Sequence, residues 1–293
     1  GIVGATPLAA TMEDIKGRAL MKRDEVDVIQ FALPVAGDND IQIINNLRDQ
    51  VQNLKEMWTG QTPAGIPMVP DELTEVAFYG REDVAALLDE GKVPLGLDLE
   101  TVEPVTWDLK KGNLLYLTDK EEQMTQFVKQ IARSKQKVIV LAPAYNELPE
   151  MEGVTILSTK EAYVAGIKKM EENIQLRLEQ QKSQHEATIV LYNQLELMND
   201  LSMDLQSSLN YVLEKGARAG YATVAMSGSQ LNRKIDEVSK SIKLYKQAIV
   251  AMRITDQSVL NVINRPVREE PLDSQVNYYV EDGFVRKVKV LMK

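Results

Sequence analysis

The residues with the clearest potential for chemistry lie in one predicted strand-to-helix turn, Tyr116 to Thr125. Such a turn binds phosphate when glycines let backbone N–H groups approach, a lysine reaches the outer phosphates and a Ser or Thr holds magnesium. This segment contains no glycine. Gln123 stands at the place of the second glycine, Met124 at the place of the lysine, and only Thr125 fits. The sequence therefore predicts a phosphate loop that no longer works.

The charges of this turn also oppose an anion. Asp119, Glu121 and Glu122 bring carboxylates to it, and each would cost roughly 4 kcal/mol against a phosphate at about 4 Å and an effective dielectric of about 20. Lys120 offsets only part of this repulsion. Thr118 and Glu121 have the spacing of a capping box. We therefore expect the helix to satisfy its own N–H groups, which a phosphate would otherwise use.

A second predicted strand, Ile189–Tyr192, leads to the other half of such a site. Nucleotide hydrolysis needs an acidic residue there to hold magnesium, often beside one that positions water. The sequence has Asn193 and Gln194, whose neutral amides cannot act as a base and are poor replacements for a magnesium carboxylate. We expect no catalytic residue and no metal ligand in this chain.

Strand and helix patterns alternate from about residue 105 onward, which implies a mostly parallel sheet with helices on both faces. Such folds bind ligands at the carboxyl ends of the strands. The predicted strands are Leu114–Leu117, Val138–Leu141, Val154–Leu157, Ile189–Tyr192, Tyr221–Ser227 and Ile249–Ile254, and the predicted helices are Glu121–Ala132, Glu161–Gln184, Leu201–Lys215 and Lys234–Gln247.

The N-terminal part has a different pattern. Residues 19–22 and 26–31 predict a hairpin, and residues 38–58 predict a helix with Asp38 or Asp40 as its N-cap. The apolar stripe of this predicted helix is interpreted as core: Ile44, Leu47, Val51, Leu54 and Trp58. A proline- and glycine-rich stretch follows from Gly60 to Pro70, and then a short helix, 82–90.

The C-terminus repeats the first hairpin. Residues 278–280 lead to a turn and then to Phe284-Val285, and Val26, Ile29 and Phe31 align with Val285, Val288 and Val290. Taken alone this repeat is weak evidence, because all hairpins alternate.

Composition excludes several classes of function. The 293 residues carry a net charge of −9, whereas nucleic-acid binders usually have a basic surplus. There is no cysteine, and His185 is the only histidine, so a histidine triad or a thiolate metal site is excluded. The longest apolar runs are far shorter than the roughly 20 residues of a membrane span, and we expect no signal peptide.

Several short motifs together resemble the FtsK/SpoIIIE-type ATPases of type VII secretion, the EssC/EccC coupling proteins. They cover nearly the whole chain in order: Gly17–Lys22, Phe31–Pro34, Ile66–Pro70, Val93–Asp98, Gly112–Tyr116, Gly216–Gly220 and Arg253–Asp256. The resemblance implies a RecA-like P-loop NTPase fold with an N-terminal hairpin and a helical, proline-rich extension.

The same resemblance implies an organisation. Residues 1–35 resemble the closing segment of a preceding ATPase module, and residues 36–293 a degenerate third module with its core from about 105. The whole protein would be membrane-anchored, with this part at the cytoplasmic face of a bacterial membrane. The implied partners are the adjacent ATPase modules and WXG-motif secretion substrates, with a link to virulence. The residues that bind a substrate stay unassigned.

The leading hypothesis is a non-catalytic module that recognises substrates or regulates neighbouring motor modules. No cofactor is expected. ATP with magnesium would bind only if the degenerate site has kept its affinity for nucleotide. One alternative is a weakly active ATPase that uses Thr125 and an unconventional base. Another is a DNA translocase, against which the charge of −9 argues.

Overall fold

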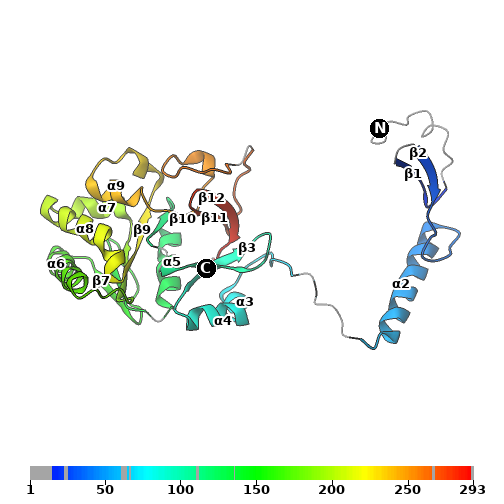
Figure 1. Ribbon diagram of the computed structural model, residues 1–293, viewed down its shortest axis with the longest axis horizontal. Helices are drawn as coiled ribbons and strands as arrows, with labels where there is room; N and C mark the ends of the chain where they lie inside the picture. The colour runs from blue at the N-terminus through cyan, green and yellow to red at the C-terminus, as the bar shows by residue number, and fades with distance from the viewer. Residues whose placement is uncertain are drawn as a thin grey trace. The chain divides into compact units, whose positions relative to one another are not determined.

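A computed structural model describes residues 15–22, 26–60, 65, 67–109, 112–134, 136–265 and 268–291. The chain divides into two compact units, unit 1 (Gly1–Ile66) and unit 2 (Pro67–Lys293), which we describe separately (Figure 1). This division is not a test of the module boundary predicted at residue 35, which stays a prediction. No helix among the described residues is long and apolar enough to cross a membrane.

Unit 1 contains a hairpin and one long helix. The strands β1 (Arg18–Lys22) and β2 (Val26–Gln30) pair antiparallel, as predicted, with Arg18 opposite Gln30. The helix α2 (Asp40–Met57) begins after Asn39, whose side-chain oxygen accepts a hydrogen bond from the Gln42 N–H at 3.0 Å. The predicted N-cap, Asp38 or Asp40, is therefore wrong, because Asn39 is the extended residue from which the helix starts.

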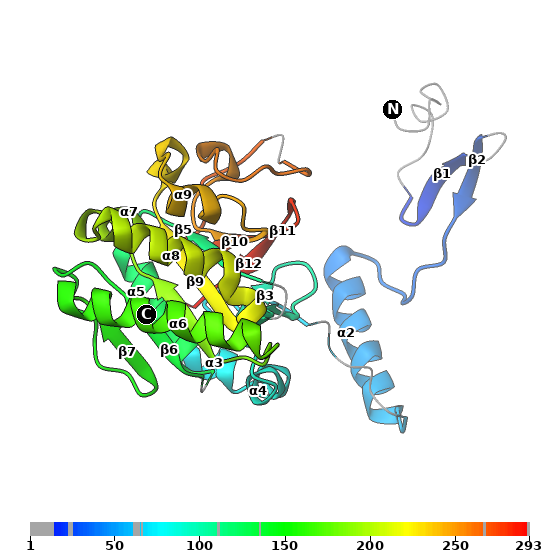
Figure 2. The same cartoon turned by 60° about the vertical axis from the view of Figure 1, so that its left-hand side comes forward.

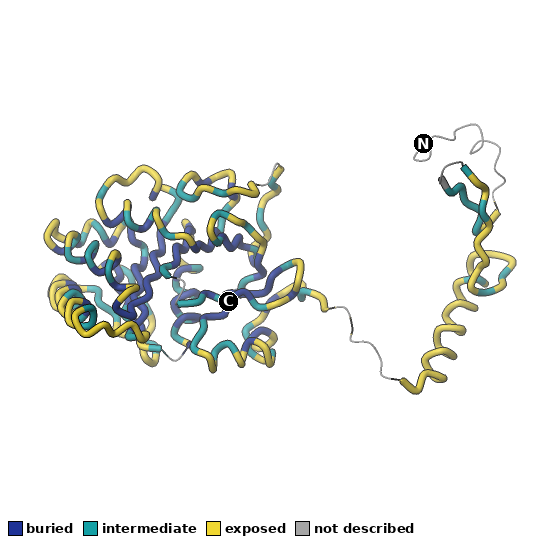
Figure 3. Tube along the Cα trace, in the orientation of Figure 1, coloured by how far each residue is buried: buried dark blue, intermediate teal, exposed yellow. Residues whose placement is uncertain are grey.

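The apolar stripe of α2 lies on the surface of unit 1. No residue of α2 is buried, and Leu54 and Met57 are 56% and 76% exposed. Figure 3 shows α2 exposed along nearly its whole length. The interpretation of this stripe as core is wrong within the unit.

Unit 2 is built on a ten-stranded sheet in the order β4-β3-β12-β11-β10-β5-β9-β8-β6-β7. The strands from β10 to β7 are parallel, as predicted, and the remaining junctions are antiparallel. The strand bounds are β3 (Val93–Asp98), β4 (Pro104–Trp107), β5 (Leu114–Leu117), β6 (Val138–Leu141), β7 (Val154–Leu157), β8 (Ala187–Leu191), β9 (Tyr221–Ser227), β10 (Gln247–Val250), β11 (Val276–Glu281) and β12 (Phe284–Lys289).

Helices cover both faces of this sheet. On one face α5 buries an apolar side formed by Met124, Phe127, Val128 and Ile131. On the other face lie α6, α7, α8 and α9, and Figure 2 shows α6 and α8 side by side there. The helix bounds are α3 (Glu75–Tyr79), α4 (Glu82–Asp89), α5 (Glu121–Ala132), α6 (Lys160–Glu179), α7 (Gln194–Asp200), α8 (Met203–Lys215) and α9 (Glu237–Ile242). Short 3₁₀ helices span Gly216–Ala219, Ser229–Arg233 and Ile254–Asp256.

Three predicted helix bounds differ from the structure. The predicted helix 161–184 ends at Glu179, since Gln181 has a positive φ of 53°. A separate helix, α7, precedes α8, because Ser202 starts α8 with a side-chain cap on the Leu205 N–H. The predicted helix 234–247 is only α9, because Asp236 caps it and the sheet resumes at β10.

Gly220 adopts the left-handed conformation in the turn that precedes β9. Its φ is +85°, and a Cβ there would lie 2.0 Å from the Gln184 carbonyl oxygen. Gly153 has a similar φ of +75°, but its nearest obstacle is 3.4 Å away. The two glycines therefore separate the cost of a left-handed backbone from the cost of a steric clash.

We expect Gly153→Ala to lower the free energy of unfolding by about 1 kcal/mol, the ordinary cost of this backbone conformation. Gly220→Ala adds the clash with a backbone oxygen and should lower it by about 3 kcal/mol or more. Urea denaturation followed by circular dichroism measures both. Equal losses of unfolding free energy in the two variants would mean that a Cβ at Gly220 does not clash with the Gln184 carbonyl oxygen.

Candidate nucleotide site

The residues predicted to form a nucleotide site do converge at the carboxyl ends of β5, β8 and β9. Thr118, Asp119, Met124 and Asn193 line one pocket of about 330 Å³. The other predicted residues lie outside it. Gln123 and Thr125 line neighbouring pockets, and Gln194 is fully buried; we describe each in turn.

The first turn of α5 is not closed by the predicted capping box. Lys120 is the N-cap residue and makes no side-chain cap. Thr118 instead accepts a hydrogen bond from the Lys120 N–H at 3.2 Å and donates its hydroxyl to Gln123 Oε1. The prediction is wrong because helical geometry begins at Glu121, so Glu121 is the first residue of the helix rather than its third.

Asp119 ties this turn to the one after β9. Its Oδ1 accepts a hydrogen bond from the Ser229 N–H at 2.8 Å. A Cβ on Gly228 would lie 2.6 Å from the same oxygen, so a larger residue there would make the Asp119 carboxylate shift. A protein carboxylate thus takes a backbone donor at the edge of the pocket where an anionic ligand would need donors.

Met124, at the lysine position, belongs to the core. Its side chain is 3% exposed and joins the cluster under α5 that includes Val140 and Tyr192. A lysine in this orientation would place its ammonium group among apolar side chains rather than beside a phosphate. Met124 therefore contributes to the hydrophobic packing of α5 against the sheet.

Thr125, the position that fits a magnesium ligand, contacts a tyrosine. Its Oγ1 lies 2.9 Å from Tyr192 Oη, and Tyr192 donates to the Glu121 carbonyl at 3.2 Å. Burial is the main effect that raises the pKa of Tyr192, so this hydroxyl stays neutral and able to donate. The Thr125 hydroxyl is therefore part of a chain of hydrogen bonds within the protein.

Asn193 and Gln194, where acidic residues would stand, differ in position. Asn193 adopts a left-handed conformation and donates to Glu121 Oε1 and to Tyr145 Oη, both at 3.2 Å. Gln194 is fully buried; it donates to Ser239 Oγ and accepts from the Ser227 hydroxyl, both at 3.1 Å. Gln194 therefore joins the end of β9 to α9 and does not reach the pocket.

The pocket has an acidic lining. Asp119, Glu121 and Glu196 contribute carboxylates, and Lys234 is the one cation among its lining residues. Partial desolvation raises the pKa of Tyr145, and the nearby Glu196 and Glu121 raise it further. No group of three or more His, Cys, Asp or Glu side chains among the described residues could hold a metal ion. Carboxylates therefore outnumber cations among the residues that line this pocket.

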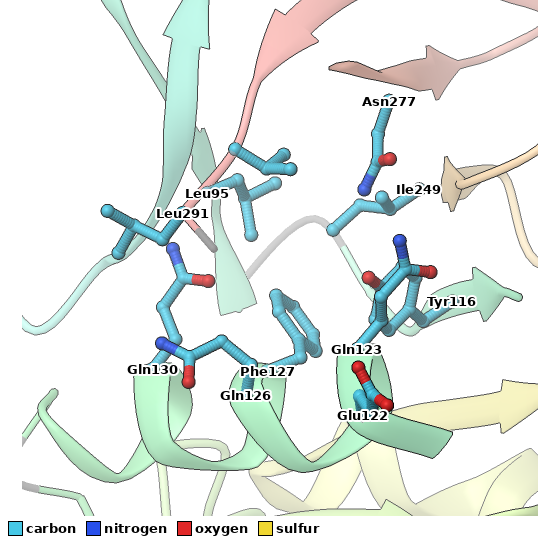
Figure 4. A pocket seen from close by; sticks show the side chains of 11 residues that line it. Leu95, Tyr116, Glu122, Gln123, Gln126, Phe127, Gln130, Ile249, Asn277 and Leu291 are labelled. Atoms are coloured by element: carbon cyan, nitrogen blue, oxygen red, sulfur yellow. The ribbon is translucent and has the colours of Figure 1, made fainter. Parts of the chain in front are cut away.

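A smaller pocket beside α5 was missed by sequence reasoning (Figure 4). It has a volume of about 80 Å³, and its apolar lining comes from several strands and α5: Leu95, Tyr116, Phe127, Ile249, Val290 and Leu291. Polar side chains, including the amides of Gln123, Gln126, Gln130 and Asn277, complete its lining. The spacing of these glutamines along α5 was the available signal, but nothing in the sequence showed that strands from both ends of unit 2 meet there.

No protein-family model matches the sequence. The chain is 25% identical over 290 residues to the type VII secretion system protein EssC of Staphylococcus aureus strain MRSA252, covering 96% of this chain and 19% of EssC. It is 27% identical over 305 residues to the ESX secretion system protein YukB of Bacillus subtilis strain 168, covering 95% and 20%. The chain thus spans about a fifth of the length of these curated relatives.

Solved structures give the same result for the fold. EssC (ATPases 2 and 3) from Geobacillus thermodenitrificans matches with a TM-score of 0.73 at 21% identity, covering 95% of this chain and 56% of that one. The cytoplasmic domain of EssC gives 0.67 at 20%, covering 99% and 60%. Thermomonospora curvata EccC (ATPases 2 and 3), in complex with a signal sequence peptide, gives 0.61 at 17%, covering 99% and 56%.

Unit 2 therefore has the α/β fold of P-loop ATPase domains, with a mainly parallel central sheet. The chain is a homologue, along about 95% of its length, of the EssC, YukB and EccC proteins of type VII secretion. This confirms the resemblance found in the sequence.

We expect Met124→Lys to lower the free energy of unfolding by about 3–5 kcal/mol, because it buries an uncompensated charge. The size-matched control Met124→Leu should cost less than about 1.5 kcal/mol. Chemical denaturation of both variants measures the difference. A lysine variant as stable as the control would show that a lysine at position 124 can extend its ammonium group into the pocket that Met124 lines.

Proposed function

We propose that this chain is a non-catalytic ATPase-fold module of a type VII secretion coupling protein. One observation carries the proposal: the side chains at the nucleotide-site positions are used by the protein's own packing. Met124 is in the core, Gln194 is buried between two serines, and Asp119 accepts a backbone N–H. A fold kept intact around a site without its chemical groups fits a binding or regulatory role better than hydrolysis.

We expect isothermal titration of the chain with ATP and magnesium to show no binding at micromolar concentrations, because the pocket lining is acidic and lacks the lysine. The alternative, a weakly active ATPase, is favoured by the retained Thr125 hydroxyl at the start of α5. Magnesium-dependent ATP turnover that Thr125→Ala abolishes would support that alternative. Micromolar ATP binding would overturn the non-catalytic proposal.

The second part of the proposal is a role in substrate recognition or in regulating neighbouring modules. A relative of the same fold, Thermomonospora curvata EccC, was solved in complex with a signal sequence peptide. Unit 2 offers an apolar pocket that would accept one aliphatic or aromatic side chain of a peptide (Figure 4). We propose secretion substrates with a WXG motif as the ligands, at the cytoplasmic face of the membrane, as the likeness to the cytoplasmic domain of EssC suggests.

We expect the chain to retain WXG-motif helical-hairpin substrates in a pull-down, with or without ATP, because binding does not depend on the nucleotide site. Thr125→Ala is the matched control and should bind equally well, since its hydroxyl contacts Tyr192 outside the apolar pocket. Recovery of no substrate would leave regulation of neighbouring modules as the remaining role.

A further inference from the structure

One edge of the ten-stranded sheet is the strand β7, which pairs with β6 and with no other strand among the described residues (Figure 2). The Val138 N–H donates to the Gly153 carbonyl at 3.0 Å. Further along the two strands, the Ala142 N–H donates to the Leu157 carbonyl at the same distance. Backbone groups of successive residues point to opposite sides of a strand, so those of Ile156 point away from β6. The Ile156 N–H and carbonyl therefore lie on the free edge of the sheet.

This edge has little protection against pairing with another strand. Sheet edges in proteins are commonly blocked by a lysine, a proline or a bulge, whereas β7 has the sequence Val-Thr-Ile-Leu and an uninterrupted register with β6. Among the strands of this sheet, β7 is the only one whose described residues include none that is buried. An apolar strand with a free edge is suited to accept an added strand.

A groove of about 320 Å³ lies between this edge and α6. Thr155 and Leu157 line it from β7. Its helix side is formed by the small residues Ala162, Ala165 and Gly166, which leave space between α6 and the strands. A strand added to β7 would direct every second side chain toward this face. The groove would then accept an aliphatic side chain of the added strand.

The groove also carries positive charge. Lys137 and Lys169 line it, and its described lining includes no carboxylate. Lys169 is exposed and forms no salt bridge with a described residue. Lys137 has only a long one, with its Nζ 3.8 Å from Glu186 Oε1. In a chain with a net charge of −9, this surface is suited to attract an acidic side chain.

We propose that β7 is a docking edge for an extended peptide segment of another protein, in which an aliphatic and an acidic residue stand two positions apart. The backbone of the segment pairs with Ile156. Because residues two apart project to the same face of a strand, both side chains face the groove. The aliphatic side chain lies beside Leu157, and the acidic one lies near Lys169.

A second copy of this chain fits this edge less well. Antiparallel pairing of two β7 edges about a twofold axis would bring Lys169 of both copies to one junction, where like charges repel. The groove lies on the α6 face of the sheet, whereas the apolar pocket of the proposed function lies beside α5 on the other face. The inference therefore does not depend on the proposed function, and each can fail alone.

Peptide binding to the 293-residue chain, measured by fluorescence anisotropy, tests the chemistry of the partner. The probe is a capped threonine peptide that carries valine and, two positions later, aspartate. We expect it to bind, and a peptide with lysine in place of aspartate to bind about 5-fold more weakly. Methylation of alternate backbone nitrogens should also weaken binding about 5-fold or more, because it removes donors to the strand edge. No binding of the aspartate peptide, or equal binding of either control peptide, would overturn the proposal.

A matched pair of lysines on α6 tests the position of the acidic side chain. We expect Lys169→Glu to weaken binding of the aspartate peptide about 5-fold or more, because it replaces attraction with repulsion. Lys168→Glu makes the same charge change at an adjacent exposed residue outside the groove lining and should leave the affinity unchanged. Equal affinities of the two variants would contradict the proposed contact.

Hydrogen exchange locates the added strand, because backbone pairing slows the exchange of an amide. We expect saturation with the aspartate peptide to slow exchange at Ile156 about 10-fold, while the amides of β4, at the opposite edge of the sheet, keep their rates. Unchanged exchange at Ile156, or slower exchange at β4 instead, would show that the peptide does not add to β7.

Discussion

The burial of the apolar side of α5 against the parallel strands is the interaction on which the rest of unit 2 depends. It places Met124, Phe127, Val128 and Ile131 against the sheet and fixes where the helix begins relative to β5. In a working phosphate loop the first turn of this helix serves an anion. Here Met124, at the position predicted for the lysine of such a loop, is buried in the core.

The polar side chains around the 330 Å³ pocket find their hydrogen-bond partners within the protein. A buried polar group must find a partner inside the protein, because an unmade hydrogen bond is costly there. Gln194 meets this condition with Ser227 and Ser239, and the Thr125 hydroxyl with Tyr192. These contacts hold β8, β9 and α9 together at the edge where a nucleotide would bind. Both amides at the predicted acidic positions, Asn193 and Gln194, thus make hydrogen bonds within the protein.

The two hairpins share a sequence pattern but differ in burial, which depends on the strands that flank them. The hairpin β11/β12 is internal to a ten-stranded sheet, and its tyrosines are core residues. The hairpin β1/β2 is also antiparallel, but among the described residues no strand flanks it. Period-two alternation encodes a strand with two faces, and it does not encode what will cover them.

The sequence by itself determined the order of the parallel strands and of the helices between them from Leu114 onward, except for α7, because period and turn residues are local signals. It also determined that Gln123, Met124, Asn193 and Gln194 carry neither a charge nor a basic group, since residue type alone settles both. It did not reveal β3 and β4 as strands of the same sheet, or the start of α5 at Glu121 rather than at a capping box. Only the tertiary structure decided which amide reaches the pocket and which is buried, because the two adjacent residues point in directions set by the packing of β9 and α9.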